Sequence, residues 1–270
     1  MKSRSSVFYV ILWSLVVGLF GFIPLIAQQN PFMTESEKRA KRLEVETLFN
    51  QAGTTDDKLR YGFELASFIA TENYDSAVAL SEALLNIALD NNNNVFISQS
   101  YFAYGNLRVA NQRSSEALYL FQKGLPYLEK KGVPPHMKAS FHQQISLIYE
   151  NMGFLEKAVE HLLISNERLY SLPKTIRRDM WLARQLNSLA NLFAENGQHQ
   201  KAIPYARSSI ELATGIEEWN VVSGAWFNIG KYASVLGDQT LKDEAFAKAA
   251  EFQELAKKKR RYPDSSPMKQ

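Results

Sequence analysis

Cysteine is absent from this chain of 270 residues, and only four histidines occur in it. Without cysteine the protein has no disulfide bond, thiolate nucleophile or thiolate metal ligand. An excess of either charge is also lacking, since 31 Lys and Arg face 28 Asp and Glu, a formal net charge of +3. So small a charge does not indicate a nucleic-acid partner. The GxSxG, P-loop and GxGxxG motifs of common enzymes do not occur. We therefore predict a non-enzyme that uses no cofactor, metal or nucleic acid.

The histidines and the recurring carboxylates agree with that prediction. The four histidines form no HExxH motif; they are His136, His142, His161 and His199. His142 and His161 are expected on successive helices, where their rings can meet, but no third ligand accompanies them. We interpret His142 as a hydrogen-bonded histidine between helices, and we attribute Glu150 and Glu195 to repetition of the sequence. The rival hypothesis of an enzyme predicts a metal or metabolite bound near His142 and His161.

Two stretches of the chain, residues 145–158 and 189–202, repeat one pattern. In each, an aromatic residue is followed four positions later by glycine and five further on by alanine. Glycine suits a tight turn with φ > 0, and alanine allows two helices to approach closely. Each stretch therefore predicts the turn of a helical hairpin. The same alanine recurs at intervals of 40, 41, 44 and 43 residues, as Ala77, Ala117, Ala158, Ala202 and Ala245.

Residues around these alanines resemble the tetratricopeptide repeat, whose first helix carries a W-x2-L-G-x2-Y pattern. Trp226, Ile229 and Gly230 match this pattern before Ala245, and Tyr101 to Gly105 stands in the same place before Ala117. The resemblance covers residues 57–256. It implies an all-α fold, a right-handed superhelical solenoid of about five antiparallel helix pairs. The expected pairs are 59–71 with 74–89, 97–111 with 115–130, 138–152 with 156–171, a helix reaching Asn196 with 200–214, and 221–236 with 242–256. Arg108 departs from the pattern, because an aromatic residue is expected there.

The two ends of the chain carry different signals. Lys2 and Arg4 precede an apolar run at residues 7–23, and Ala27 follows shortly. This arrangement is typical of a secretory signal peptide at residues 1–27, with an uncleaved membrane anchor as the alternative. Residues 34–51 are expected to form a helix, with Thr34 and Glu37 in a capping box. Residues 257–270 form a basic, polar tail, interpreted as a solvated helix end or alternatively as a contact with anionic lipid or an acidic partner.

The resemblance also implies a function. In this family the concave face, lined by the first helix of each pair, binds extended peptides or partner helices. The polar residues expected to face outward there are Asn106, Gln143, Arg184, Asn187, Asn191, Asn228 and Lys231. Asn and Gln can pair with a peptide backbone, and Arg and Lys can hold a carboxylate. A lysine expected in the third repeat of chaperone-binding members is missing, so chaperone binding is not carried over.

The leading hypothesis is a non-catalytic protein–protein interaction scaffold of a bacterial cell envelope, exported across the inner membrane. Its partner would be a protein or peptide, and it would touch the membrane only through an uncleaved N-terminal segment. The alternative is a membrane-tethered sensory or regulatory module, anchored in the inner membrane, that works with a separate signalling partner.

Overall fold

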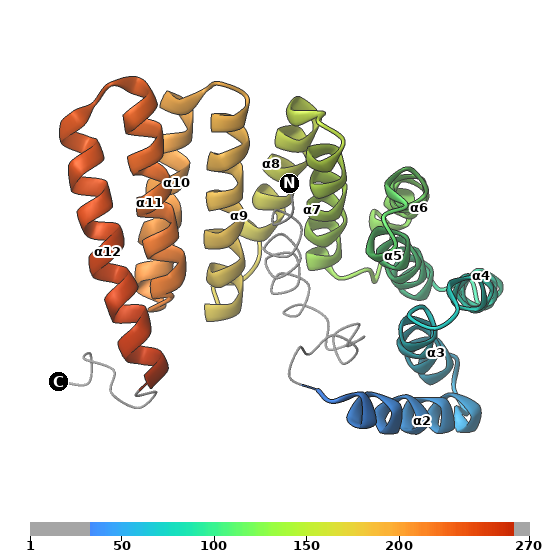
Figure 1. Ribbon diagram of the computed structural model, residues 1–270. Helices are drawn as coiled ribbons and strands as arrows, with labels where there is room; N and C mark the ends of the chain where they lie inside the picture. The colour runs from blue at the N-terminus through green and yellow to red at the C-terminus, as the bar shows by residue number, and fades with distance from the viewer. Residues whose placement is uncertain (1–32, 262–270) are drawn as a thin grey trace. The chain divides into compact units, whose positions relative to one another are not determined.

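A computed structural model describes residues 33–261, and within that range the chain is helical without any strand (Figure 1). The predicted all-α class and the arrangement in helix pairs are confirmed. The helices are α2 (Glu35–Gln51), α3 (Thr55–Ile69), α4 (Tyr74–Asp90), α5 (Asn94–Ala110), α6 (Ser114–Leu128), α7 (Pro135–Asn151), α8 (Leu155–Tyr170), α9 (Ile176–Glu195), α10 (His199–Gly215), α11 (Trp219–Leu236) and α12 (Gln239–Arg261).

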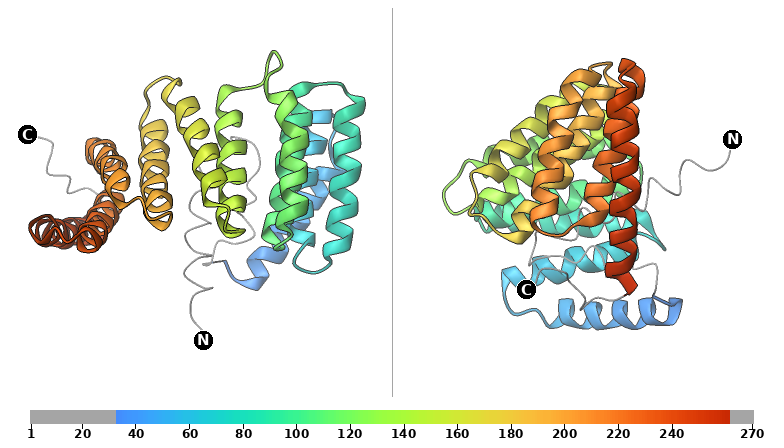
Figure 2. Two further views of the ribbon diagram at one scale, coloured as in Figure 1. Left: turned by 90° about the horizontal axis from the view of Figure 1, so that it is seen from above. Right: turned by 90° about the vertical axis from the view of Figure 1, so that its left-hand side faces the viewer.

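The chain forms two compact units that divide within α7, between Phe141 and His142. In the first unit α3 packs against α4, and α5 packs against α6. In the second unit α9, α10, α11 and α12 pack in chain order, as both views of Figure 2 show. Each helix therefore covers its apolar side with its neighbours in sequence, as expected of stacked hairpins.

The five recurring alanines occupy the same environment. In four second helices, α4, α6, α8 and α10, the alanine is the fourth residue. In α12 the alanine is the seventh residue. This repeat has three extra residues, which add one turn at the start of the helix, after Gly237. All five side chains are fully buried. A methyl group at this position lets the two helices of a pair approach closely. The register deduced from the spacing is confirmed.

Glycine closes the turns of the last three hairpins in the left-handed conformation. The φ angles are +79° at Gly153, +73° at Gly197 and +75° at Gly237. After Gly153 the backbone N–H of Phe154 donates to the carbonyl of Tyr149 at 2.8 Å, which satisfies a carbonyl at the helix end. Gln112 takes the same place in the second hairpin with φ +60°, and Arg113 N–H donates there to the Arg108 carbonyl. The turn therefore forms even where glycine is missing.

Arg108 explains why the second repeat departs from the family pattern. Its guanidinium donates to the hydroxyls of Tyr74, at 2.9 Å, and Tyr104, at 2.6 Å, and forms an ion pair with Glu116 at 2.8 Å. The Tyr104 hydroxyl in turn donates to Glu82 at 2.8 Å. Burial, with the bond to Glu82, raises the pKa of Tyr104 to about 12. One arginine thus joins α4, α5 and α6 where an aromatic ring would only pack.

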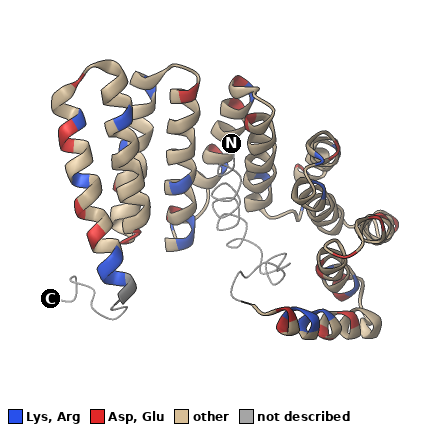
Figure 3. Ribbon diagram, in the orientation of Figure 1, with Lys and Arg blue, Asp and Glu red and all other residues tan. Residues whose placement is uncertain are grey.

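The predicted helix at residues 34–51 is α2, and its capping box is present. The Thr34 hydroxyl accepts from the backbone N–H of Glu37, whose carboxylate accepts from the backbone N–H of Thr34. Along α2 a block of four basic residues lies between two pairs of acidic residues (Figure 3). The helix buries Val45 against Leu65 and Phe68 of α3. It therefore adds one more packed layer to the first unit.

Helix α2 occupies the sequence position of the second helix of a pair. No first helix precedes it among the described residues. Its start, Glu35, precedes the start of α4 by 39 positions, close to the repeat interval. Its fourth residue, where the second helices α4, α6, α8 and α10 carry a buried alanine, is Lys38. The lysine side chain is about one-third exposed and pairs with Glu35 at 2.7 Å. Among residues 33–261 the close helix–helix contact made at the alanines therefore has no counterpart at Lys38.

The C-terminal basic run continues α12, which extends to Arg261, five residues beyond the expected end of the repeats. The ammonium of Lys259 donates to the carbonyl of Glu217 at 3.0 Å and pairs with its carboxylate at 3.2 Å. The predicted signal or anchor at residues 1–27 and the tail after residue 261 lie outside the described residues. Within residues 33–261 no helix combines the length and the apolar character that spanning a bilayer requires.

Candidate functional site

Three of the predicted binding residues form side-chain hydrogen bonds between α9 and α11. The amide of Asn228 donates to the side-chain carbonyl of Asn187 at 3.2 Å, and the hydroxyl of Tyr232 donates to that of Asn191 at 2.5 Å. Each bond joins residues 41 positions apart, about one repeat. Asn187 and Asn191 lie one turn apart on α9, as Asn228 and Tyr232 do on α11, so both bonds form on one face.

A hollow of about 280 Å³ opens between α9 and α11 beside these bonds. It is lined by Asn191, Ala194, Glu195, His199, Asn228, Lys231, Tyr232 and Val235. Three of these residues, Asn191, Asn228 and Lys231, are among those expected from the sequence. The ammonium of Lys231 is exposed to solvent. Amide groups, one cation and one carboxylate thus surround a space large enough for a side chain of a partner.

Arg184 begins the stripe of polar residues on α9. It precedes Asn187, Asn191 and Glu195 by three, seven and eleven positions, which places all four along one side of the helix. The guanidinium lies 3.7 Å from the carboxylate of Glu218, at the start of α11. The basic residue and the acidic residue Glu195 therefore stand at opposite ends of this face.

The structure corrects the expected exposure of two predicted residues. Gln143 is only 7% exposed, because its side-chain carbonyl accepts from the amide of Gln185 at 3.0 Å. Gln185 in turn accepts from the hydroxyl of Ser165 at 2.9 Å, so the chain of bonds joins α7, α8 and α9 inside the second unit. Asn106 is 8% exposed and belongs to the first unit. Neither side chain faces outward as predicted.

Five residues of the hollow were not predicted as binding residues: Ala194, Glu195, His199, Tyr232 and Val235. Helical spacing carries a signal for two of them, since Tyr232 and Val235 follow Asn228 by four and seven positions. Glu195 continues the stripe that begins at Arg184. His199 opens α10, and only the turn after α9 brings it to the hollow.

The negative charge of Glu195 on α9 acts on Glu150 of α7. Burial raises the pKa of Glu150 to about 7, and the negative charge of Glu195 adds to this effect. Burial, together with the same Glu195 charge, raises the pKa of the Tyr232 hydroxyl. Tyr232 therefore keeps its proton near neutral pH and remains the donor to Asn191.

The expected contact between His142 and His161 is confirmed. Their Nδ1 atoms lie 2.9 Å apart and their rings are stacked with centroids at 5.1 Å. Burial lowers the pKa of His161, which favours the neutral ring that a bond between two imidazoles requires. Within residues 33–261 no group of three His, Cys, Asp or Glu residues is arranged to hold a metal ion.

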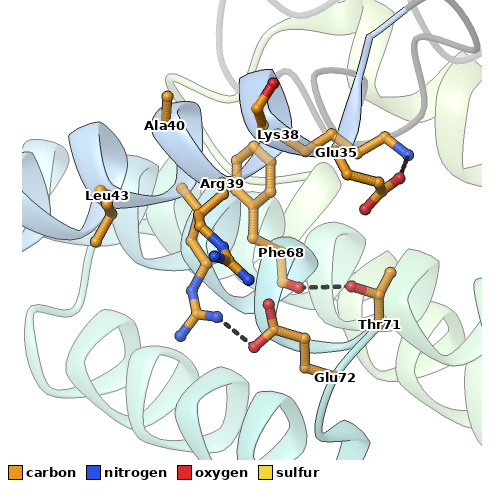
Figure 4. A pocket seen from close by; sticks show the side chains of 10 residues that line it. Glu35, Lys38, Arg39, Ala40, Leu43, Phe68, Thr71 and Glu72 are labelled. Atoms are coloured by element: carbon orange, nitrogen blue, oxygen red, sulfur yellow. Dashed lines mark hydrogen bonds and ion pairs between the residues drawn. The ribbon is translucent and has the colours of Figure 1, made fainter.

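A larger hollow, of about 700 Å³, lies in the first unit between α2 and the end of α3 (Figure 4). Its basic residues are mostly matched by acidic neighbours: Lys38 pairs with Glu35, and Arg42 pairs with Glu72. Phe68 lies beneath these pairs and is almost fully buried. The internal pairing leaves little free charge for a partner, so the α9–α11 face is the stronger candidate.

The sequence matches no protein-family model and no curated protein. Solved structures do match. BtubC from P. vanneervenii aligns with a TM-score of 0.66 at 15% identity, over 82% of this chain and 90% of its own. The TPR-like repeats of a kinesin light chain from Podosopora anserina align with a TM-score of 0.60 at 16% identity, over 74% and 97%. YrrB, described as a TPR protein with an unusual peptide-binding site, aligns with a TM-score of 0.51 at 15% identity, over 77% and 92%. The chain therefore has the tetratricopeptide-repeat fold.

Proposed function

We propose that this protein is a non-catalytic interaction scaffold that binds an extended peptide, or a helix of a partner, on the α9–α11 face. The observation that carries the proposal is the pairing of Asn187 with Asn228 and of Asn191 with Tyr232. These bonds use only part of the capacity of the three amides, since each asparagine has two donor and two acceptor positions. The unused groups lie beside the hollow.

A peptide backbone presents one donor and one acceptor for each residue. Asn228 retains its side-chain carbonyl as an acceptor, and Asn191 retains its amide as a donor. Because the existing bonds hold these side chains in one orientation, binding costs less conformational entropy than it would with free side chains. Arg184 and Lys231 add cations at either side. The fold of YrrB, which has a peptide-binding site, agrees with such a role.

The test is capture of polypeptides by the immobilised protein, followed by repetition with a variant carrying Asn187→Ala and Asn191→Ala. We expect a specific polypeptide to be retained by the natural protein and lost by at least tenfold with the variant, since buried groups of the partner would lose their hydrogen bonds. The control carries Gln200→Ala and Gln253→Ala, which are exposed polar residues of α10 and α12. Equal capture by both variants would contradict the assignment of this face.

We further propose that the protein is exported and works in the bacterial cell envelope. The support is the sequence of residues 1–27, where basic residues precede an apolar run. Mass spectrometry of the N-terminus of the protein recovered from cells tests this. A first residue at Gln28 supports a free envelope protein. A retained Met1 supports the tethered sensory module instead, and recovery from the cytosol with an intact N-terminus would contradict export.

A further inference from the structure

Two carboxylates stand without a partner beside the α9–α11 face. Within residues 33–261 the carboxylates of Glu150 and Glu195 take part in no ion pair or hydrogen bond. Both lie in the last turn of their helices, α7 and α9, where the unsatisfied backbone carbonyls already carry partial negative charge. Glu195 lines the hollow, and its negative charge helps to raise the pKa of Glu150. No ion pair within the described residues therefore balances the negative charge of these two carboxylates.

The neighbouring groups do not neutralise this charge. His199 of α10 faces the hollow together with Lys231 and Tyr232 of α11. The Lys231 ammonium is exposed and forms no ion pair with Glu195, and Tyr232 is a neutral donor to Asn191. On α8, Lys157 and His161 contact the ring of Tyr149 instead. A cation from outside the chain is the missing counterpart.

We propose that the peptide bound on this face carries a lysine or arginine whose charged group lies against Glu195, at the end of the hollow, where the charge of Glu150 also attracts it. The proposal rests on the proposed function and adds the chemistry of the partner. The stem of a lysine or arginine is apolar and fits along Val235 and Ala194, which line the same hollow. Its charged end then reaches the carboxylate of Glu195. Arg184, at the opposite end of the stripe, disfavours a second basic residue there and sets the direction of the peptide.

Protonation should oppose binding of this cation. Glu150 titrates with a pKa of about 7, so at pH 6 it is mostly neutral and attracts a cation weakly. If binding requires the ionised form, the affinity for a basic peptide falls about tenfold between pH 8 and pH 6. His199 also faces the hollow. A His199→Gln variant therefore separates its contribution, and we expect the pH dependence to persist in it.

The experiment uses the full chain in mild detergent and ten-residue fluorescent peptides of alternating alanine and serine, with Lys, Gln or Glu scanned through the central positions. Fluorescence anisotropy gives the affinity of each peptide. We expect one position at which Lys binds at least fivefold more tightly than Gln, and Glu more weakly still. The preference should shrink in Glu150→Gln and Glu195→Gln. It should remain in Glu251→Gln, which removes an exposed carboxylate of α12 away from the hollow.

The outcomes separate the two proposals. Peptides that bind on the α9–α11 face without regard to charge would uphold the proposed function and overturn this inference. A preference for Lys that survives both Glu150→Gln and Glu195→Gln would also overturn it, because the cation would then lie elsewhere. If no peptide binds at any position or pH, the face does not take extended peptides and the inference falls with that part of the proposed function.

Discussion

Replacing Glu150 by glutamine should stabilise the protein at alkaline pH and leave its stability unchanged at acidic pH. In the folded protein burial and the charge of Glu195 raise the pKa of Glu150 from 4.5 to about 7. In the unfolded chain the carboxyl has its ordinary pKa. Between these two values the folded state binds more protons than the unfolded state, so the free energy of unfolding decreases as the pH rises.

The expected size of this effect follows from the two pKa values. Their difference corresponds to a loss of about 3 kcal/mol in the free energy of unfolding, complete above pH 7 and absent below pH 4.5. Glutamine has nearly the same shape but no charge, so the variant avoids the loss. We therefore expect Glu150→Gln to be more stable than the natural protein by up to about 3 kcal/mol at pH 8, and equal to it near pH 4.5.

Urea unfolding at pH 4.5, 6 and 8, followed by tryptophan fluorescence, measures the difference. Three of the four tryptophans, Trp181, Trp219 and Trp226, belong to the second unit, which contains Glu150. The control is Glu251→Gln, since its carboxyl is exposed. The reasoning is refuted if the stability difference for Glu150→Gln is independent of pH, or if the variant is less stable than the natural protein at pH 8.

Glycine substitutions give further predictions. Gly153→Ala should destabilise the protein by about 1 kcal/mol through backbone strain alone, since φ is +79° and no atom lies near the added methyl group. Gln112→Gly should stabilise it by up to about 1 kcal/mol, because Gln112 has φ +60°. Gly230→Ala should destabilise it by about 1–3 kcal/mol, since the methyl carbon would lie 2.7 Å from the Phe246 ring. Gly224→Ala in the same helix meets no atom and should stabilise it by about 0.5–1 kcal/mol. Thermal unfolding followed by circular dichroism tests all four, and a Gly230→Ala variant as stable as Gly224→Ala would contradict the packing described for α11 and α12.

The repeats could be predicted because few residue types can replace alanine at a close helix contact or glycine at a turn with positive φ. A buried alanine such as Ala158 marks a close helix contact, and a glycine such as Gly153 marks a turn with positive φ. Both requirements act locally, so the spacing alone reveals them. Gln112 shows the limit of this reasoning, since the backbone takes the same conformation there without glycine.

The candidate binding face was harder to predict, because burial depends on contacts distant in the sequence. Glutamine is usually a surface residue, so Gln143 was expected to be exposed. It is buried because it accepts a hydrogen bond from Gln185, 42 positions away, within a buried chain of hydrogen bonds. Tyr232 reads as a core aromatic and is indeed buried, yet its hydroxyl reaches Asn191 at the surface. Residue type therefore located the helices of the face, and only the packing decided which side chains lie on it.

Lys38 limits how this array of hairpins could be lengthened. A further first helix laid on α2 would need the close approach that a methyl group permits at Ala77, and a lysine side chain with its ion pair to Glu35 occupies that space. An engineered duplication of a hairpin ahead of α2 should therefore pack poorly until Lys38 is changed to alanine.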